Sequence, residues 1–558
     1  MRIPHHLSFR FAVLSTLCLT LASVCAAQCT FPAKATGRVL TYIVAATVTP
    51  ESTVLHITLK FQGNAEGAEE IEFPAHWAGE TIRGVINLRA ISSDTVLTDA
   101  PGENHKMLHY PPNQPVVLAY DVVKDWTGPF KAPLQFHGVI MPEYIEINGD
   151  NALVHPKMEG QDPVTANFDW QKIPAAWALA TSFGTSSGPD DRCQSYSGKW
   201  TEVEDALFTA GDFRIHHFQI GKRPAVLAIR GQWTFTDEQV IADIQKVVGI
   251  VRDFWHDDNF PYFLVTLKAY DQDHGSGDGS GFTNAFWLYM SRLDPFTTQL
   301  TQLSHESFHA WNPRRMGPRS DADDDKVISW FHEGFTTYYA DVLVYRASLM
   351  PLTAVIENIN RDLRDYPKSE SPYVRGRVIA TWLDWQIRKN SNNKSSLDNM
   401  MFDMVHEADK PLTNDRILQT AGRYIAPAAR VELQQAVQQH ALPQMSGATF
   451  GPCVQLTIDD LPRFDLGLDY VATNTAHKIT GVVPDGPAYK AGLRDGQLLN
   501  GRVSVYNGHT DKPAIFTIQT DDGTKAIEYY PRGKTIATPQ FHLDEKTYAA
   551  NEASCRMQ

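Results

Sequence analysis

The clearest pattern near the N-terminus is an alternation of apolar and polar residues over positions 55–61. The apolar positions are Leu55, Ile57, Leu59 and Phe61, and a polar residue stands between each pair. Side chains along a β-strand point alternately to its two faces, so this alternation predicts a strand with one face in a core. Similar runs, separated by turn residues, continue to about residue 201. Residues 28–201 are therefore predicted to form an all-β, sandwich-like domain.

The pattern changes near Thr236, where apolar residues begin to recur at helical spacing. Thr236 and Gln239 have the spacing of a capping box, which starts a helix. The apolar residues that follow are Val240, Ile244, Val247, Val248, Val251 and Trp255. The next predicted elements are a strand over 262–270, a glycine-rich hairpin tip over 274–281, a strand over 285–290 and a helix over 298–312. Residues 202–448 are therefore predicted to form a second, mostly helical domain.

The central chemical motif is His305-Glu306-Ser307-Phe308-His309, in the predicted helix 298–312. A spacing of four residues places both imidazoles on one face of a helix, where they can share one Zn²⁺ ion. Glu306 lies beside them and is placed to take a proton from a water molecule at the metal. The motif thus predicts a catalytic zinc site with its general base on the same turn.

A catalytic zinc ion needs a third protein ligand and a position left open for water. Glu333 follows within WFHEGFTTYYADVL, which is predicted to be a second helix. His332 is the rival ligand, but neighbours in sequence face different sides of a helix, and a carboxylate completes the pattern better. Thr337, one turn after Glu333, either hydrogen-bonds a ligand without touching the metal or is an ordinary polar helix residue.

The stretch HESFHAWNPRRMGP, with WFHEGFTTYYADVLVYRASLM after it, resembles the metal-binding segment of the glycyl aminopeptidase family. Its members are gluzincin metallopeptidases that commonly join a β-rich N-terminal domain, a thermolysin-like catalytic domain and a C-terminal PDZ domain. The resemblance implies that His305, His309 and Glu333 bind one zinc ion and that Glu306 is the general base. It extends to SPYVRGRVIATWLDWQIR, where Tyr373 would donate a hydrogen bond to the developing oxyanion; the alternative is a packed helix aromatic.

One position departs from the family pattern, in the stretch Gly281, Phe282, Thr283 and Asn284 that is predicted to bind substrate. In related aminopeptidases a glutamate in this stretch forms a salt bridge with the free α-amine of the substrate. Thr283 stands at its position, and a neutral hydroxyl cannot neutralise an ammonium group. Asp278 and Asp273 on the nearby loop are candidate replacements. Both an aminopeptidase and an endopeptidase therefore fit the sequence.

The C-terminal part resembles a PDZ domain in the stretches RFDLGLDY and KITGVVPDGPAYKAGLRDGQLLNG. By this resemblance residues 449–540 form the domain, with Leu466, Gly467 and Leu468 as its carboxylate-binding loop, and 541–558 form a tail. A PDZ domain adds a peptide strand to its sheet edge and holds a C-terminal carboxylate with backbone N–H groups. The alternative is a degenerate PDZ domain that only packs against the catalytic domain.

Residues 1–27 have the parts of a secretory signal peptide: a basic start, an apolar run and small residues before a cleavage position near Ala26 or Ala27. No later stretch is apolar for long enough to cross a membrane, so the mature protein is predicted to be periplasmic or extracellular. Four cysteines remain after cleavage, and such a compartment is oxidising. The favoured pairs are Cys29 with Cys193 and Cys453 with Cys555, because each closes one end of the chain onto its own domain.

Charge narrows the choice of partner. The chain has 50 Lys and Arg against 64 Asp and Glu, a formal net charge of −14, which argues against nucleic acid. The sequence therefore predicts a secreted, multidomain α+β zinc peptidase, and the family implies aminopeptidase action on peptides with small N-terminal residues such as Gly or Ala. An endopeptidase is the alternative within the enzyme class. A catalytically weak factor that captures peptides at the PDZ groove is the alternative outside it.

Overall fold

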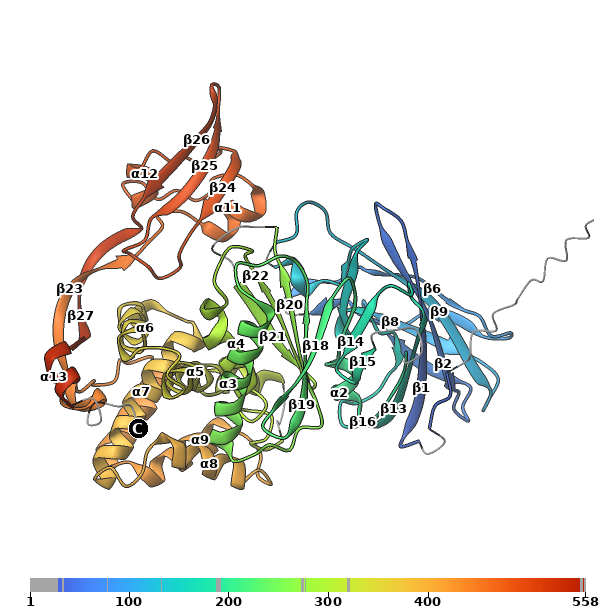
Figure 1. Ribbon diagram of the computed structural model, residues 1–558, viewed down its shortest axis with the longest axis horizontal. Helices are drawn as coiled ribbons and strands as arrows, with labels where there is room; N and C mark the ends of the chain where they lie inside the picture. The colour runs from blue at the N-terminus through green and yellow to red at the C-terminus, as the bar shows by residue number, and fades with distance from the viewer. Residues whose placement is uncertain are drawn as a thin grey trace, which may run out of the picture.

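The alternating segment lies in a strand of the computed structural model, β2 (Thr53–Gln62), and its alternate residues are buried as predicted. The strands that share a sheet with it are β1 (Arg38–Val48), β6 (Val85–Ala90), β9 (Pro115–Val123), β13 (Pro163–Lys172) and β16 (Cys193–Lys199). Their order is β16-β13-β1-β2-β9-β6 (Figure 1). Neighbouring strands are antiparallel, except that β1 and β13 are parallel.

Two smaller sheets pack with this one around a shared core. One sheet contains β3 (Ala68–Glu72), β7 (Val96–Asp99), β8 (His105–His109) and β12 (His155–Pro156). The other contains β10 (Val139–Ile140), β11 (Tyr144–Asn148), β14 (Ala178–Thr181), β15 (Gly184–Ser186) and β17 (Leu207–Gly211). Leu55, Ile71 and Ile147, one from each sheet, lie in the same buried cluster. A disulfide joins Cys29 to Cys193 at the start of β16, so this predicted pair is confirmed.

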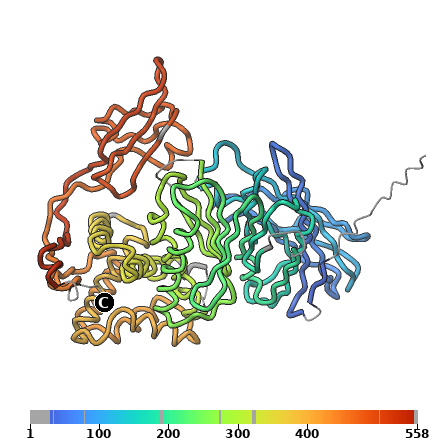
Figure 2. Tube along the Cα trace, viewed as in Figure 1, coloured from blue at the N-terminus to red at the C-terminus, as the bar shows by residue number. Residues whose placement is uncertain are grey.

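A fourth sheet, of five strands, stands at the centre of the molecule (Figures 1 and 2). Its strands are β18 (Arg214–Ile220), β19 (Arg223–Ile229), β20 (Phe263–Ala269), β21 (Gly277–Phe282) and β22 (Ala285–Met290), in the order β18-β19-β20-β22-β21. The three middle strands are parallel and the two edge strands antiparallel to them. The strands predicted over 262–270 and 285–290 are thus confirmed.

The glycine-rich segment was predicted as a hairpin tip over 274–281, and its second half is instead the edge strand β21. The reason is close packing on both sides of the glycines. A methyl group on Gly279 would lie 2.4 Å from the ring of Phe286, and one on Gly277 would lie 2.3 Å from the Gln299 amide. Glycine therefore lets this strand approach its neighbours where a side chain would not fit.

The central sheet is covered on both faces. On one face lies α3 (Asp237–Trp255), which begins at the predicted capping box of Thr236 and Gln239, together with α4 (Leu300–Phe308). The other face packs against the N-terminal region, where Trp287 and Tyr289 of β22 meet Phe136 and Phe130. The sheet therefore joins the β-rich region to the helices, and its edge strand β21 lies alongside α4.

The remaining helices form a bundle behind α4. They are α5 (Ala322–Arg346), α6 (Leu352–Asp365), α7 (Pro372–Ser391), α8 (Leu397–His406), α9 (Asn414–Tyr424) and α10 (Pro427–Gln439). Helices α5 and α7 pack closely at Gly334 and Gly376, since a methyl group on Gly376 would lie 2.0 Å from the Trp330 carbonyl oxygen. One buried cluster runs through all of these helices.

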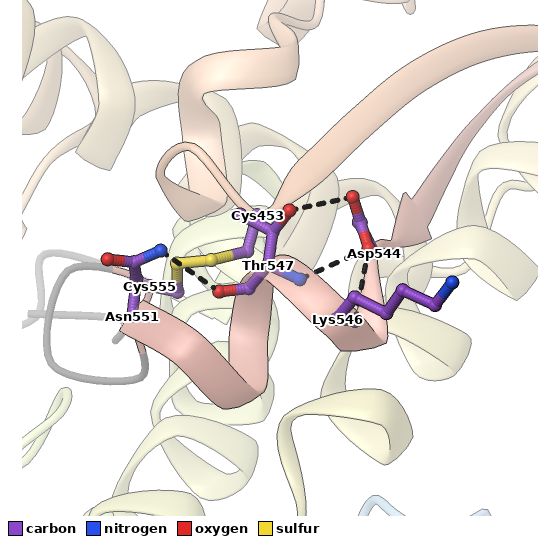
Figure 3. The surroundings of a disulfide bond; sticks show 6 residues. All are labelled: Cys453, Asp544, Lys546, Thr547, Asn551 and Cys555. Carbon is purple, nitrogen blue, oxygen red and sulfur yellow. Dashed lines mark hydrogen bonds between the residues drawn. A yellow bond between two sulfur atoms is a disulfide. The ribbon is translucent and has the colours of Figure 1, made fainter.

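The C-terminal part extends from the helical region on a two-stranded ribbon, orange to red in Figure 1. The ribbon consists of β23 (Val454–Phe464) and β27 (Arg532–Leu543), and the small domain that it carries contains α11 (Tyr470–Ala476), α12 (Pro487–Lys490), β24 (Leu499–Ser504), β25 (Ala514–Thr520) and β26 (Gly523–Tyr529). At the base of the ribbon, beside α13 (Glu545–Asn551), the predicted disulfide joins Cys453 to Cys555 (Figure 3).

The structure describes residues 29–32, 35–77, 79–131, 133–186, 192–271, 275, 277–318, 322–551 and 555. The predicted leader, residues 1–27, lies outside them. Among the described helices, none combines the length and the apolar character that a membrane crossing requires. The fold is multidomain and mixed, with a β-rich N-terminal region followed by a helical region, as predicted.

Candidate active site

Three predicted metal ligands converge where α4 meets α5. The Nε2 atoms of His305 and His309 lie 3.0 Å apart, and the Oε2 atom of Glu333 lies 3.2 Å from the first and 3.4 Å from the second. Zinc binds such donors at about 2.0–2.1 Å, and a tetrahedral arrangement at that length separates neighbouring donors by roughly 3.3 Å. Among the described residues, this is the one group of three or more such side chains whose donor atoms converge. The donor set and its spacing therefore fit zinc.

Neighbouring groups fix the orientation of both imidazoles. Nδ1 of His309 lies 2.8 Å from the Asn312 carbonyl oxygen, so a proton on Nδ1 leaves Nε2 free to bind a metal. The Thr337 hydroxyl donates to the Glu333 carbonyl oxygen at 2.8 Å and lies 3.4 Å from Nδ1 of His305. Thr337 thus contacts the predicted ligand His305, and its supporting role stays a prediction. His332 lines the same cavity but is not part of the converging group.

Burial and hydrogen bonds set the protonation states of the predicted metal ligands. Burial would raise the pKa of Glu333, but hydrogen bonds from His305 and His309 hold it below its usual range. Burial lowers the pKa of His305 to about 4, which favours the neutral imidazole that a metal requires. The protein therefore presents one carboxylate and at least one neutral imidazole at this point.

Glu306 points into the same space from the turn that carries the histidines. Its Oε2 atom accepts the Gly281 N–H at 3.1 Å, and its Oε1 atom accepts the Gln302 amide at 2.7 Å. Burial raises the pKa of Glu306 to about 7, although the charge of His309 opposes the shift. A carboxylate with a pKa near neutrality can both take and return a proton.

Tyr373 lies at the start of α7, with its ring centroid 5.9 Å from that of His305. Its side chain is half-exposed and lines the cavity. Burial and the charge of Glu333 raise its pKa above the usual range, so the phenol keeps its proton and can donate a hydrogen bond.

A cavity of about 700 Å³ encloses these groups. Of the stretch predicted to bind substrate, Gly281 lines the cavity, whereas Phe282, Thr283 and Asn284 do not. Phe282 is buried against Trp77 and Trp287, and the Thr283 N–H donates to the Asp205 carbonyl oxygen at 2.8 Å. The structure thus brings one member of that stretch into the cavity.

Strand β21 runs beside α4 in the same direction. This common direction allows the two ends of the cavity to be told apart. Gly279 accepts a hydrogen bond from Gln302 at 3.4 Å, and Gly281 lies one helical turn further along, at Glu306. The strand therefore carries Thr283 past Glu306 toward one end, and it leaves Asp278 at the other.

The Thr283 end contains Arg314, which lines the cavity and forms an ion pair of 3.1 Å with Asp205. At the other end Asp278 accepts hydrogen bonds from Gln135 at 2.6 Å and from the Gly279 N–H at 2.9 Å. Asp278 stands three residues before Gly281, about 10 Å along a strand, and lines the cavity at the end away from Thr283. Its role as a replacement for the missing glutamate stays a prediction. Asp273, the other candidate, lies outside the described residues.

The sequence comparison finds one family model that matches part of the chain. Residues 298–403, which contain all three converging donors and Tyr373, match the family model described as M61 glycyl aminopeptidase. This chain is therefore similar to M61 glycyl aminopeptidases over the segment that carries its metal group. It is accordingly a zinc metallopeptidase, and the His305, His309 and Glu333 group is where the structure accommodates a metal. Among curated proteins, none matches the sequence significantly.

Solved structures are similar to this chain at low sequence identity. A protein of the aminopeptidase N family from Idiomarina loihiensis is 16% identical, with a TM-score of 0.67 over 90% of this chain and 98% of that one. An M1 zinc metallopeptidase from Deinococcus radiodurans is 13% identical, with a TM-score of 0.48 over 74% of this chain and 97% of that one. The first likeness shows that the overall fold is shared.

The predicted carboxylate-binding loop, Leu466, Gly467 and Leu468, lies in the small C-terminal domain. The Gly467 N–H donates to the Asp465 side chain at 2.8 Å, and the Leu466 carbonyl oxygen accepts the Tyr529 hydroxyl at 2.7 Å. The segment after Leu468 is helix α11, which Asp469 caps. A peptide that docked here by strand addition would therefore find a helix, not a strand, directly after the loop.

Some cavity residues escaped prediction from the sequence. Gln302 lies one helical turn before Glu306, so helical spacing alone places it beside the base. Arg314 and Arg361 line the cavity from a loop and from α6, respectively. No motif signals them, because only the packing of α4 with α5 and α6 brings them to the metal group.

Proposed function

We propose that this protein is an exported aminopeptidase that removes small N-terminal residues such as Gly or Ala from peptides. The observation that carries the proposal is the convergence of His305, His309 and Glu333 beside Glu306 in one cavity. The similarity of residues 298–403 to glycyl aminopeptidases supports the preference for small residues.

In this proposal each residue has one task. Bound zinc would supply a Lewis acid that polarises the scissile carbonyl and lowers the pKa of a water molecule. Glu306 takes the proton of the attacking water and passes it to the leaving amine. Tyr373 donates its phenolic hydrogen to the oxyanion, which develops only in the transition state.

An aminopeptidase also needs an acceptor for the α-amine, and Asp205 is our candidate. Its backbone oxygen accepts the Thr283 N–H at 2.8 Å, so it lies beside the position where the family has a glutamate, and its carboxylate contacts Arg314, which lines the cavity. Burial raises the pKa of Asp205 to about 6, so it is ionised at neutral pH, when it pairs with Arg314. An ammonium group would share that carboxylate with Arg314.

The second candidate function is endopeptidase action, and the same ion pair favours it. Because Arg314 already neutralises Asp205 and Thr283 is neutral, this end of the cavity offers an ammonium group no unpaired carboxylate among the described residues. A peptide that extends further on the N-terminal side of the scissile bond would then bind as well as a peptide with a free α-amine.

Two quenched fluorogenic peptides with the same Ala-led sequence separate the candidates, one with a free N-terminus and one acetylated. Chelator-sensitive cleavage of the free peptide at its first bond is the expected result. In that case Asp205→Asn should lower kcat/KM for the free peptide by roughly tenfold or more, because a charge-assisted bond is lost. Equal cleavage of both peptides would establish the endopeptidase, and cleavage of neither would contradict both candidates.

Location and the role of the C-terminal domain are part of the proposal. Two disulfides form in the structure, which supports an oxidising compartment, and the predicted leader would deliver the chain to a periplasm or outside the cell. For the C-terminal domain we propose a PDZ-like module that packs against the catalytic helices through its loop at His509 and Thr510.

A further inference from the structure

Arg361 lines the same cavity as the metal-binding group, from helix α6. Two other arginines line this cavity, and each is neutralised. Arg314 pairs with Asp205 at 3.1 Å, and Arg377 pairs with two aspartates at 2.6 and 2.8 Å. Arg361 forms no ion pair with any residue that the structure describes. Arg361 is therefore the cavity arginine that has no carboxylate within ion-pairing distance among the described residues, and the charges of Asp362 and Asp341 act on it only from further away.

The guanidinium group of Arg361 is held in place by neutral partners. It donates to the Asn358 side-chain oxygen at 2.8 Å, and its other terminal nitrogen lies 3.1 Å from Nε2 of His509. Asn358 is itself fixed by Asp341, to which its amide donates at 3.2 Å. These contacts use two of the five N–H donors of the arginine, so donors remain for a ligand.

The surroundings of Arg361 favour an anion. Its stem packs against the C-terminal domain, since a methyl group on Gly508 would lie 2.9 Å from its Cδ atom. Burial lowers the pKa of Arg361, which means that its charge has lost part of its hydration. A carboxylate at this point would regain that lost stabilisation in a place where ion pairs are less screened than at the surface.

The position of Arg361 along the cavity sets which part of a peptide can reach it. One face of α5 runs from Glu333 through Thr337 to Asp341, and these residues line the cavity. Eight residues of helix span about 12 Å, which an extended peptide covers in three to four residues. Thr337 contacts His305, which precedes Glu306 on α4, and β21 passes Gln302 at Gly279 before it reaches Glu306 at Gly281. Asp341 therefore leads toward the Asp278 end of the cavity and away from Thr283, which is the side of the leaving peptide.

We propose that Arg361 binds a substrate carboxylate three to four residues beyond the scissile bond, so that the enzyme prefers short peptides with a negative charge there. The inference rests on the proposed function, because it takes the Thr283 end as the N-terminal end of the substrate. The carboxylate can be the C-terminus of a tetrapeptide or pentapeptide, or an Asp or Glu side chain in a longer chain.

Three alanine-based tetrapeptides test the proposal on the full-length, zinc-loaded protein. The first has a free C-terminal carboxylate, the second a C-terminal amide, and the third an amide with Glu as its last residue. We expect kcat/KM for the free acid to exceed that for the plain amide by roughly ten- to a hundredfold, the usual range for a charge-assisted pair. The Glu-containing amide shows whether a side chain serves as well as the C-terminus.

Substitutions at two positions of α6 test whether Arg361 causes the preference for the free acid. Arg361→Met should remove the preference by lowering kcat/KM for the free acid alone, while the plain amide reports that the fold and the chemistry are intact. Arg364→Met is the matched control, because Arg364 also contacts the C-terminal domain, at Thr510, but does not line the cavity. Arg361→Lys, which keeps the charge, should keep part of the preference.

Equal cleavage of acid and amide by the wild type would overturn the proposal. So would a parallel loss of both activities in Arg361→Met, or the same loss in Arg364→Met. Binding of the same peptides to Glu306→Gln, measured by calorimetry, separates this inference from the proposed function. If the wild type cleaves none of the peptides, the binding measurement still decides. Tighter binding of the free acid than of the amide to Glu306→Gln, lost in the double variant Glu306→Gln with Arg361→Met, would support the role of Arg361. Equal binding of acid and amide would refute it.

Discussion

Two sites were predicted from short motifs: the metal group of His305, His309 and Glu333, and the C-terminal loop of Leu466, Gly467 and Leu468. The motif determines the geometry of the first site but not that of the second. In His305 and His309 the spacing of one helix sets the relative position of two side chains, and only one further contact, with α5, is needed to bring Glu333 to them. At Leu466, Gly467 and Leu468 the motif specifies a loop, while binding depends on the element beside it. That element is the helix α11, where strand addition would need a strand. A motif predicts a site best when the motif itself contains the geometry.

The largest expected effect tests whether the motif is a catalytic centre as well as a metal site. Glu306→Gln should lower kcat for an Ala-led peptide by about 10²–10⁴-fold, because general acid–base catalysis contributes that much. The zinc content, measured by atomic spectroscopy, should stay near one ion per chain, because Glu306 is not among the converging donors. Turnover that persists in a folded, zinc-loaded variant would rule out Glu306 as the base.

A smaller effect should follow from disturbing the helix contact that supports the metal group. In Gly376→Ala the new methyl group would lie 2.0 Å from the Trp330 carbonyl oxygen and 2.4 Å from Cα of Gly334. Helices α5 and α7 must then separate, which should cost about 1–3 kcal/mol of unfolding free energy. Because Glu333 and Tyr373 flank this contact, kcat/KM should fall by roughly tenfold or more.

The control for this substitution is Gly249→Ala in helix α3. A methyl group there meets nothing within 4 Å, so the variant should gain about 0.5–1 kcal/mol from helix propensity and keep its activity. Denaturant unfolding and peptide turnover check both variants. Equal behaviour of the two would mean that the contact between α5 and α7 does not position the site.

The sequence predicted those parts of the fold that depend on local periodicity. Alternation placed β2, and the capping box placed the start of α3 at Thr236. Local reasoning failed at β21, because its glycines are typical of a loop and only the packing against α4 and β22 makes them a strand. Arg361 shows the same limit, since it lies in a different helix from either half of the metal group and reaches the cavity through tertiary packing.

The smallest expected effect on turnover concerns the C-terminal loop of Leu466, Gly467 and Leu468. Gly467 has φ of +70°, and a methyl group on it would lie 2.8 Å from Pro487 and 2.9 Å from the Ala488 nitrogen. Gly467→Ala should therefore destabilise the C-terminal domain by about 1–3 kcal/mol, through backbone strain and crowding. Turnover of the amidated alanine tetrapeptide, which lacks a carboxylate for Arg361, should change less than about twofold at 25 °C, because 1–3 kcal/mol still leaves the domain folded. Separate calorimetric transitions for the catalytic and C-terminal parts, with only the second shifted, would show that the loop supports its own domain and not the chemistry. A large loss of turnover on this peptide would instead mean that the C-terminal domain takes part in catalysis beyond its contact with Arg361.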